Sequence, residues 1–256
     1  MRLAVCIPTY NEKENISGLI PEIFRYAPDA HVIVADDNSP DGTAEIASQI
    51  PGNVSVLLRR ADRGFANSYK DAFAYALTKG ADLILQMDAD FSHHPRFIPQ
   101  MVESIKNSDF VVGSRYKKGG EVVNWPWFRK FLSKGGNTYA SMFLGRGVSD
   151  MTGGFNLWRR STLERIPVMD FVCDGYSFLI ELKFRALQLG FKPLEVPIQF
   201  VDRTQAASKM SGKIMAEAVL RVPVLALSKP PKNLTQFNLN PHTEVLDDYK
   251  PSAVGF

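Results

Sequence analysis

The chain has 256 residues, of which 45% are hydrophobic and 22% are charged. This length is enough for one sizeable α/β domain, and the composition excludes a wholly disordered protein. The formal net charge of +3 gives no reason to expect a nucleic acid as partner. The two cysteines, Cys6 and Cys173, are too few and too far apart for a disulfide framework or a metal knuckle. We therefore expect both to be reduced thiols in a cytosolic setting.

The first half of the chain alternates short β-rich runs with helical patterns, which predicts a mostly parallel sheet flanked by helices. Strands are expected at residues 3–8, 31–35, 54–58, 82–87 and 109–113. Helices are expected at residues 12–26, from residue 41 onward, at 65–77 and at 95–105. In the second half, the pattern predicts a helix around residues 176–189 and a strand near residues 194–200.

Residues 117–147 interrupt this alternation and are rich in glycine, aromatic and basic residues. Three apolar residues of this segment fall on one helical face: Trp125, Phe128 and Leu132. Three basic residues beside them can reach anionic headgroups: Arg129, Lys130 and Lys134. This pattern is typical of an amphipathic helix at a membrane surface, although composition alone favours an ordinary core helix with a solvated basic face. Residues 209–227 could form a second helix that faces a membrane or a partner.

Neither end of the sequence predicts a membrane anchor or a folded extension. The apolar run at residues 3–7 is too short for a signal peptide. The longest later apolar stretch, residues 214–227, falls short of the roughly 20 apolar residues that a transmembrane helix needs. We expect one domain at residues 1–228 and a disordered tail at residues 229–256, where periodicity is absent and prolines recur.

Two aspartates, Asp88 and Asp90, directly follow the apolar run at residues 82–87. A strand that ends in two carboxylates places them at the carboxyl edge of the sheet, where open α/β sheets bind ligands. Mg²⁺ is commonly bound by one or two carboxylates together with substrate phosphates. Aspartates also cap turns, and the motif alone does not decide between these two interpretations.

Polar residues follow three further strands, in the segments 8–12, 36–43 and 113–116. Each segment could be turn chemistry by itself, but four polar edges together predict a nucleotide site. No glycine-rich phosphate loop follows the first strand, which argues against a dinucleotide oxidoreductase and a P-loop NTPase. The phosphate charge would instead be met by a cation and by arginines.

Five motifs occur in order along residues 3–220: Pro-Thr-Tyr-Asn-Glu, Asp-Asp-Asn-Ser-Pro-Asp-Gly-Thr, Met-Asp-Ala-Asp-Phe-Ser-His-His-Pro, Gly-Ser-Arg-Tyr and Phe-Val-Asp-Arg with Ser-Lys-Met-Ser. Together they resemble the polyprenyl- and dolichyl-phosphate β-mannosyltransferases. These are inverting glycosyltransferases of family 2 with a GT-A fold, an α/β fold with a Rossmann-like, mostly parallel sheet. The resemblance favours interfacial amphipathic helices in the second half of the chain.

The resemblance also implies roles for individual positions, with Asp37 reading the guanine or the ribose. The expected nucleotide-sugar contacts are Pro8, Tyr10, Glu12, Ala35, Asp37, Asp88, Ala89, Asp90, Arg115, Arg203 and Lys209. The expected metal ligands, for Mg²⁺ or Mn²⁺, are Asp88 and Asp90. The expected acceptor-phosphate contacts are Arg115, Arg129 and Ser133, and the expected catalytic residues are Asp90, Arg115 and Arg203.

The implied reaction moves mannose from GDP-mannose to a polyprenyl or dolichyl phosphate, with inversion and a divalent cation. The resemblance also implies peripheral contact with the cytosolic face of a membrane, where a membrane-protein partner could hold the enzyme. Two alternatives remain open: a polyprenyl-phosphate glucosyltransferase that uses UDP-glucose, and a non-catalytic nucleotide-sugar-binding subunit.

Several residues keep two interpretations. Asp150 could line the sugar pocket or cap a loop, and Glu181 is similarly ambiguous. We expect His93 and His94 to be turn and capping residues rather than metal ligands. Some relatives carry a glutamine ligand where this chain has Ser92, which puts a metal role for position 92 in doubt. No contact is assigned to residues 60–66, which depart from the family pattern.

Overall fold

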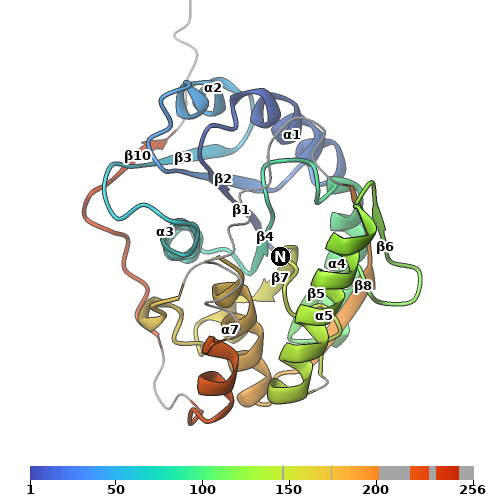
Figure 1. The fold of residues 1–256 in the computed structure, drawn as a ribbon. Coiled ribbons are helices and arrows are strands. Elements are labelled where there is room, and N and C mark those ends of the chain that lie inside the picture. The colour runs from blue at the N-terminus through green and yellow to red at the C-terminus, as the bar shows by residue number, and fades with distance from the viewer. Residues whose placement is uncertain (146, 174, 202–219, 231–234, 248–256) are drawn as a thin grey trace, which may run out of the picture.

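The computed structural model describes residues 1–145, 147–173, 175–201, 220–230 and 235–247. Its main feature is an eight-stranded sheet in the order β10-β3-β2-β1-β4-β7-β5-β8, with helices on both faces (Figure 1). The predicted fold class, a mostly parallel sheet flanked by helices, is confirmed.

The parallel half of the sheet is built from β1 (Leu3–Thr9), β2 (His31–Asp36), β3 (Val54–Arg59) and β4 (Leu83–Gln86). β1 lies between β2 and β4, and β3 follows β2. These strands are nearly continuous apolar runs because both faces of a parallel sheet are buried. The helices between them are α1 (Lys13–Tyr26), α2 (Thr43–Gln49) and α3 (Phe65–Thr78).

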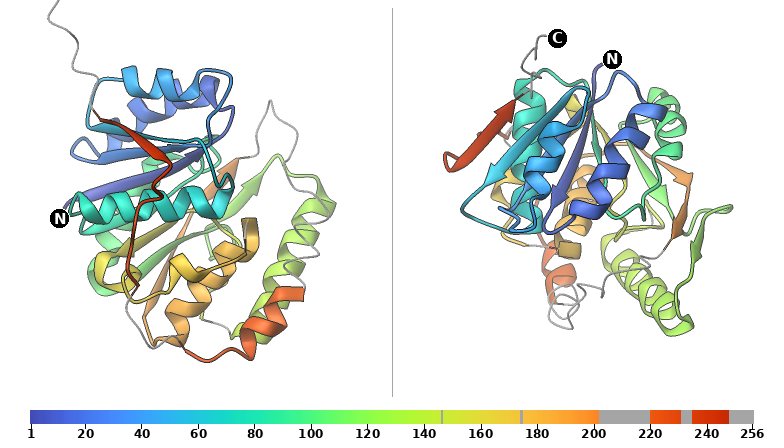
Figure 2. Two further views of the ribbon diagram at one scale, coloured as in Figure 1. Left: turned by 90° about the vertical axis from the view of Figure 1, so that its left-hand side faces the viewer. Right: turned by 90° about the horizontal axis from the view of Figure 1, so that it is seen from above.

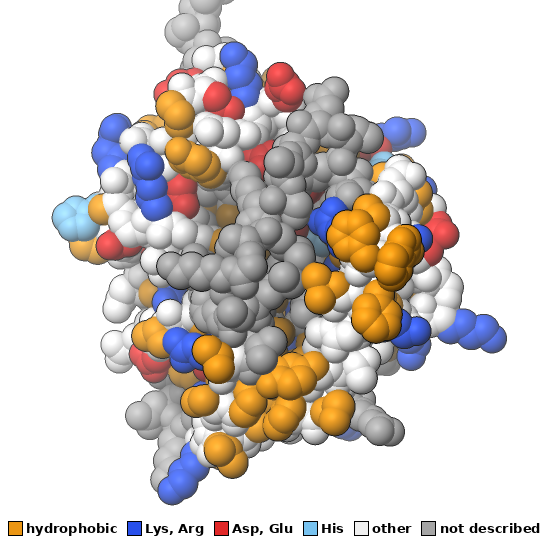
Figure 3. Space-filling view, viewed as in Figure 1, with side chains coloured by type: hydrophobic (Ala, Val, Ile, Leu, Met, Phe, Trp, Pro, Cys, Tyr) orange, Lys and Arg blue, Asp and Glu red, His pale blue; other side chains and the backbone are white. Residues whose placement is uncertain are grey.

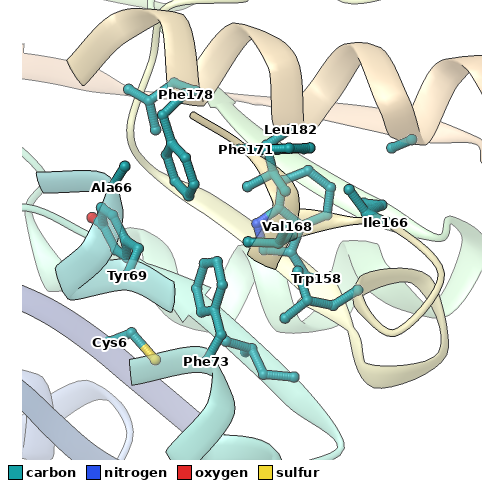
Figure 4. Close-up of a cluster of buried hydrophobic side chains, with 14 of the residues drawn as sticks. Cys6, Ala66, Tyr69, Phe73, Trp158, Ile166, Val168, Phe171, Phe178 and Leu182 are labelled. Atoms are coloured by element: carbon teal, nitrogen blue, oxygen red, sulfur yellow. The ribbon is translucent and has the colours of Figure 1, made fainter. Parts of the chain in front are cut away.

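The alternation of side chains along β1 divides the hydrophobic core into two layers. Val5 and Ile7 point to the face covered by α1, α2 and α4 (Ile98–Ser104), whereas Ala4 and Cys6 point to the face covered by α3 and α7 (Gly175–Gln188). Aromatic rings fill the second layer, where Tyr69 of α3 stacks on Phe178 of α7 at a centroid distance of 6.0 Å (Figure 4).

The other half of the main sheet contains β5 (Phe110–Ser114), β7 (Asn156–Arg159) and β8 (Pro193–Pro197). β7 runs antiparallel between β4 and β5, while β8 pairs with β5 in parallel. The single strand expected near residues 194–200 is divided, because the chain leaves β8 to form β9 (Gln199–Val201), which pairs with β6 (Glu121–Val123) in a separate sheet.

Short helical elements complete the fold. They are α6 (Arg160–Leu163) and the 3₁₀ turns η1 (Pro95–Phe97), η2 (Ile105–Asn107) and η3 (Val168–Asp170). The helix predicted at residues 95–105 is therefore confirmed as η1 followed by α4.

α5 (Trp127–Leu144) lies on the outside of the molecule, beside the edge formed by β5 and β8 (Figures 1 and 2). Its buried residues are Asn137, Ala140 and Leu144, all in its second half. Four large apolar side chains of its first turns are exposed: Trp127, Phe128, Phe131 and Leu132. Apolar side chains therefore gather on the surface over α5 (Figure 3). Within the described ranges, no helix is long and apolar enough to cross a membrane.

Two expectations about these regions need correction. Trp125 does not belong to the apolar face of α5, because it precedes the helix and is only 8% exposed. The expected disorder of residues 229–256 is wrong for β10 (Thr243–Asp247), which pairs antiparallel with β3 and forms the edge of the sheet (Figure 1). A short strand without its own hydrophobic period is recognisable only once the edge that it pairs with is known.

Candidate active site

The loops that follow β1 and β2 meet at the carboxyl edge of the sheet. The Glu12 N–H donates to Thr43 Oγ1 at 3.0 Å, and the Asn11 N–H donates to Ser39 Oγ at 2.9 Å. Asp36 fixes Ser39 in turn, because its Oδ1 accepts the Ser39 N–H at 2.7 Å. The hydrogen bonds that stabilise these two turns therefore also hold together one wall of the candidate site.

Asp37, the residue expected to contact the nucleoside, lies at this edge and is held by groups that the sequence analysis missed. Its Oδ1 accepts hydrogen bonds from the buried Arg59 guanidinium and from Ser68 Oγ, the latter at 3.0 Å. Its Oδ2 accepts the Gly64 N–H at 2.9 Å. Residues 60–66 therefore support the site. The arginine at the end of the mostly apolar strand β3 was the available signal in the sequence.

The other residues expected at the nucleoside end line the same edge. Tyr10 is 40% exposed, and the Arg63 guanidinium lies 5.8 Å from the centroid of its ring. Pro8 is half-buried, and Glu12 is buried. These positions present an aromatic ring and polar groups to a ligand that approaches the edge.

Ala35 and Ala89 are buried, so their contribution to a ligand site would come from the backbone. Arg203 and Lys209 lie outside the described residues. The sequence prediction for these two basic residues therefore remains a prediction.

Asp88 and Asp90 lie in a tight loop after β4. The Asp88 N–H donates to His93 Nδ1 at 3.1 Å, while Asp90 Oδ1 accepts from Ser92 Oγ at 2.5 Å and from the Ser92 N–H at 3.1 Å. Phe91, between them, adopts a left-handed backbone with φ of 60°. Asp90 therefore caps this turn, which follows β4 at the carboxyl edge of the sheet.

The described residues include no group of three or more His, Cys, Asp or Glu side chains that could hold a metal ion by themselves. A pair of carboxylates nevertheless fits a hard divalent cation whose remaining ligands are phosphate oxygens and water. Gly154 leaves room beside this pair, since a Cβ there would lie 3.4 Å from Asp88 Oδ1.

His93 forms the floor of the carboxylate loop. Its ring stacks on Phe155 at 5.1 Å and meets Phe200 edge-on at 5.6 Å. Burial lowers the pKa of His93 to about 4, so the imidazole is neutral and Nδ1 can accept from the Asp88 N–H. The 3.7 Å approach of Nδ1 to the Asp88 carboxylate is therefore not an ion pair at neutral pH. The expected capping role fits His93, and it also fits His94, whose Nδ1 accepts the Arg96 N–H.

A buried ion pair between Arg115 and Asp150 forms the opposite wall. Arg115 Nε donates to Asp150 Oδ2 at 2.8 Å, and Nη2 donates to Oδ1 at 2.6 Å and to Thr152 Oγ1 at 2.8 Å. Burial by itself would raise the pKa of Asp150, but the charge and hydrogen bonds of Arg115 hold that pKa below its ordinary value. Asp150 is completely buried, so it positions Arg115 and the following loop rather than lining a sugar pocket.

Lys183 of α7 supports the same loop from inside the protein. Its ammonium is completely buried and donates to the carbonyl oxygens of Met151 at 3.0 Å and Gly153 at 2.7 Å. Burial lowers the pKa of Lys183 to about 7. The sequence analysis missed this residue, although a lysine on the apolar side of a helix was a visible signal. Glu181, in contrast, accepts from Cys173 Sγ and Arg185, so it has a structural role.

The expected acceptor-phosphate residues come together around Trp125. The Arg129 guanidinium lies 4.3 Å from the centroid of the Trp125 ring, and the Arg115 guanidinium lies 5.7 Å from it. Ser133, one turn beyond Arg129, accepts from the Tyr116 hydroxyl at 2.7 Å. The indole of Trp125 thus holds two guanidinium groups from separate segments near one point.

The whole site is continuous through aromatic contacts. Arg115 lies 5.3 Å from the Phe200 ring centroid, and Phe200 contacts His93, which binds the backbone of the carboxylate loop. An aromatic floor of His93 and Phe200 therefore connects the carboxylate loop with the two guanidinium groups around Trp125. Such a site suits two phosphate groups, one bound through a cation and the other through arginines.

Comparison with known proteins decides the family. The model of glycosyl transferase family 2 matches residues 4–166. The chain belongs to this family.

Two curated relatives have similar length to this family 2 chain. One is polyprenol monophosphomannose synthase of Mycolicibacterium smegmatis, which is 40% identical and aligns over 86% of this chain and 85% of its own. The other is undecaprenyl-phosphate mannosyltransferase of Micrococcus luteus, which is 39% identical over 87% of this chain and 93% of its own. The predicted resemblance is thereby confirmed.

The fold of this family 2 chain also matches solved structures of glucosyl-3-phosphoglycerate synthase from Mycobacterium tuberculosis. The complex with Mn²⁺, UDP and glucosyl-3-phosphoglycerate has a TM-score of 0.62 at 18% identity and covers 90% of this chain and 81% of that one. The complex with Mn²⁺, UDP and phosphoglyceric acid has a TM-score of 0.65 at 16% identity, with coverages of 90% and 79%. At these identities the similarity concerns the fold.

The buried Lys183 predicts a pH-dependent stability. Because its pKa falls from the ordinary 10.5 to about 7 on folding, the unfolded chain binds more protons between these pH values. The stability of the native protein relative to Lys183→Met should therefore rise with pH across this window, by at most about 1.4 kcal/mol per pH unit. Urea unfolding of both proteins at pH 7, 8 and 9 measures this difference. Equal pH dependence of the two proteins would contradict the assignment.

Proposed function

We propose that the protein transfers mannose from GDP-mannose to a polyprenyl phosphate with inversion, giving β-mannosyl phosphoryl polyprenol and GDP. The single structural observation that carries this proposal is the guanidinium pair around Trp125, which ring contacts through Phe200 and His93 connect to the carboxylate loop. The names of the two mannosyltransferase relatives support the sugar and the lipid acceptor.

The geometry suits an in-line displacement at the anomeric carbon. An oxygen of the acceptor phosphate forms the new bond to this carbon, while the bond to the β-phosphate oxygen of GDP breaks. The acceptor phosphate is already anionic at neutral pH, so the nucleophile needs no strong general base. Arg129 would orient the acceptor, since guanidinium pairs with phosphate through two parallel hydrogen bonds. Arg115 would add positive charge beside it, because its Nε and Nη2 already donate to Asp150 and Thr152.

Asp88 and Asp90 are proposed to hold a divalent cation, either Mg²⁺ or Mn²⁺. When bound, such a cation stabilises the negative charge of the departing nucleoside diphosphate. The Mn²⁺ in the structurally similar complexes supports this assignment. Asp37 would meet the nucleoside, with its orientation set by Arg59 and the Gly64 N–H.

The apolar face of α5 is proposed to bring the site to the cytosolic face of a membrane. Its side chains are far more exposed than ordinary core residues, with Trp127 at 81%, Phe131 at 77% and Met142 at 77%. Residues 220–226 are helical and add exposed apolar side chains, among them Leu220 and Val224. Since Arg129 lies on the same helix, a phosphate at the bilayer surface would be within reach of the site. A membrane-protein partner could add to this attachment.

A panel of labelled nucleotide sugars tests the donor. With polyprenyl phosphate in vesicles, we expect product from GDP-mannose and none from UDP-glucose.

Asp90→Ala should lower turnover by about 100-fold or more, because the leaving diphosphate loses its counter-charge. Asp29→Ala, an exposed aspartate at the opposite edge of the sheet, is the matched control and should stay active. In the panel of nucleotide sugars, turnover with UDP-glucose alone would show that UDP-glucose is the donor. Binding of GDP-mannose without any sugar transfer would favour a non-catalytic subunit.

Arg129→Ala tests the acceptor site. Loss of a charge-assisted phosphate contact should raise the KM for polyprenyl phosphate by about 10- to 100-fold and leave the KM for GDP-mannose unchanged. Lys134→Ala removes an exposed positive charge from the same helix and is the control. Initial-rate kinetics with each substrate varied in turn give both constants. An unchanged acceptor KM in Arg129→Ala would remove this residue from the site.

Tryptophan fluorescence tests the membrane contact. Of the three tryptophans, Trp125 and Trp158 are buried and Trp127 is exposed. Anionic vesicles should therefore shift the emission of Trp127 to shorter wavelength and protect it from acrylamide quenching. In Trp127→Phe this shift should disappear while co-sedimentation with vesicles persists. An emission spectrum that vesicles leave unchanged in the native protein would show that α5 does not enter the bilayer surface.

A further inference from the structure

Residues 235–247 return from the far end of the chain to the nucleotide side of the sheet (Figure 2). β10 pairs with β3 in a register that sets Thr243 directly opposite Arg59. Arg59 is the residue whose guanidinium orients Asp37. The C-terminal segment therefore reaches Arg59, although more than 180 residues separate Arg59 and Thr243 in the sequence.

Arg59 is the centre of a buried network. Its side chain is completely buried, and its Nε donates to Asp71 Oδ2 of α3 at 2.7 Å. Its Nη2 donates to the carbonyl oxygen of Asp62 at 2.7 Å, and its Nη1 donates to Asp37 Oδ1 and Ser68 Oγ. A guanidinium has fixed, planar donor directions, so these contacts together determine where Nη1 presents its hydrogens to Asp37.

The C-terminal segment supplies further donors to this network. Thr243 Oγ1 donates to Asp71 Oδ2 at 3.1 Å, and the Asn240 N–H donates to Asp71 Oδ1 at 3.2 Å. Asn240 Nδ2 also donates to Asp62 Oδ2 at 2.8 Å. Among the residues that the structure describes, Asp62 and Asp71 are the two outside the nucleoside site that accept hydrogen bonds from the Arg59 side chain. Both therefore also accept hydrogen bonds from the C-terminal segment.

These donors matter because Asp71 is only 4% exposed. A buried carboxylate is stable only when its charge is paired and its oxygens accept hydrogen bonds. Without Thr243 and Asn240, Asp71 would turn toward other donors or water, and Arg59 would lose the partner that fixes its Nε. The position of Asp37 would then be less defined.

We propose that Asn240 and Thr243 are positioning residues of the donor site, which act through Asp71 and Arg59 on Asp37. The C-terminal segment is in this sense a strap that completes the nucleoside pocket from the outside of the sheet. The inference rests on the proposed function, because it takes Asp37 as the contact of the donor nucleoside.

Thr243→Val tests the strap with little change in shape, since valine keeps the side-chain volume and suits a strand. We expect the KM for GDP-mannose to rise about 3- to 10-fold, as for the loss of one hydrogen bond to a charged group, with kcat and the KM for polyprenyl phosphate unchanged. Asn240→Ala keeps the N–H donor to Asp71 and removes only the Nδ2 contact with Asp62, so the KM for GDP-mannose should rise in the same direction but by less. Thr243→Ser, which keeps the hydroxyl, should restore the native KM.

Glu244→Gln is the matched control, because Glu244 lies beside Thr243 in β10 and its carboxylate forms an exposed pair with Arg60 at 2.9 Å. It should leave all three constants unchanged. A merely structural role of β10 would lower activity through thermal stability, with no selective effect on the donor KM and no rescue by Thr243→Ser.

Asp37→Asn distinguishes a failure of the strap from a failure of the proposed donor site. If Asp37→Asn raises the donor KM but Thr243→Val and Asn240→Ala do not, the strap is overturned and the donor site stands. If Asp37→Asn leaves the donor KM unchanged, both assignments are overturned. If the native protein uses another nucleotide sugar, the proposed donor fails, and the same variants measured with that sugar decide the strap.

Discussion

The buried ion pair between Arg115 and Asp150 is the interaction on which the site depends. It joins the end of β5 to the loop before β7, and Lys183 fixes the continuation of that loop from below. Two charges in a dry interior are stable only as a pair, and removal of either partner from such a pair costs about 3–5 kcal/mol. The constraint keeps one guanidinium beside Trp125, where a second one, from Arg129, approaches from another segment.

The edge at which we propose that the nucleoside binds has a similar arrangement, in which Asp71 holds Arg59 and Arg59 donates to Asp37. Each side of the site thus has a buried arginine whose direction is set by an aspartate. A neutral His93 and the ring of Phe200 connect Arg115 with the loop that carries Asp88 and Asp90. Fixed dipoles and charges of this kind need little reorganisation when a ligand arrives, which is the usual basis of electrostatic catalysis.

Sequence patterns predicted the sheet and its helices because both are local consequences of hydrophobic period. β1 to β5 are buried apolar runs, and α1 and α3 present apolar faces at helical spacing. The residues at strand ends were also recognisable, since parallel strands must end at one edge. Trp125, Lys183 and the C-terminal strap were not predicted correctly, because the role of each depends on a partner far away in sequence. For Trp125 that partner is Phe200, and for Thr243 it is Asp71.

The sequence by itself therefore determined the family, the order of most strands and helices, and the polar residues available at the sheet edge. These follow from short-range patterns that survive without any knowledge of packing. Only the tertiary structure decided which carboxylates are paired with arginines and which lie at the carboxyl edge of the sheet. Burial and distance set that division: Asp150 and Asp71 lie inside and are committed to arginines, whereas Asp88 and Asp90 end a strand at the rim.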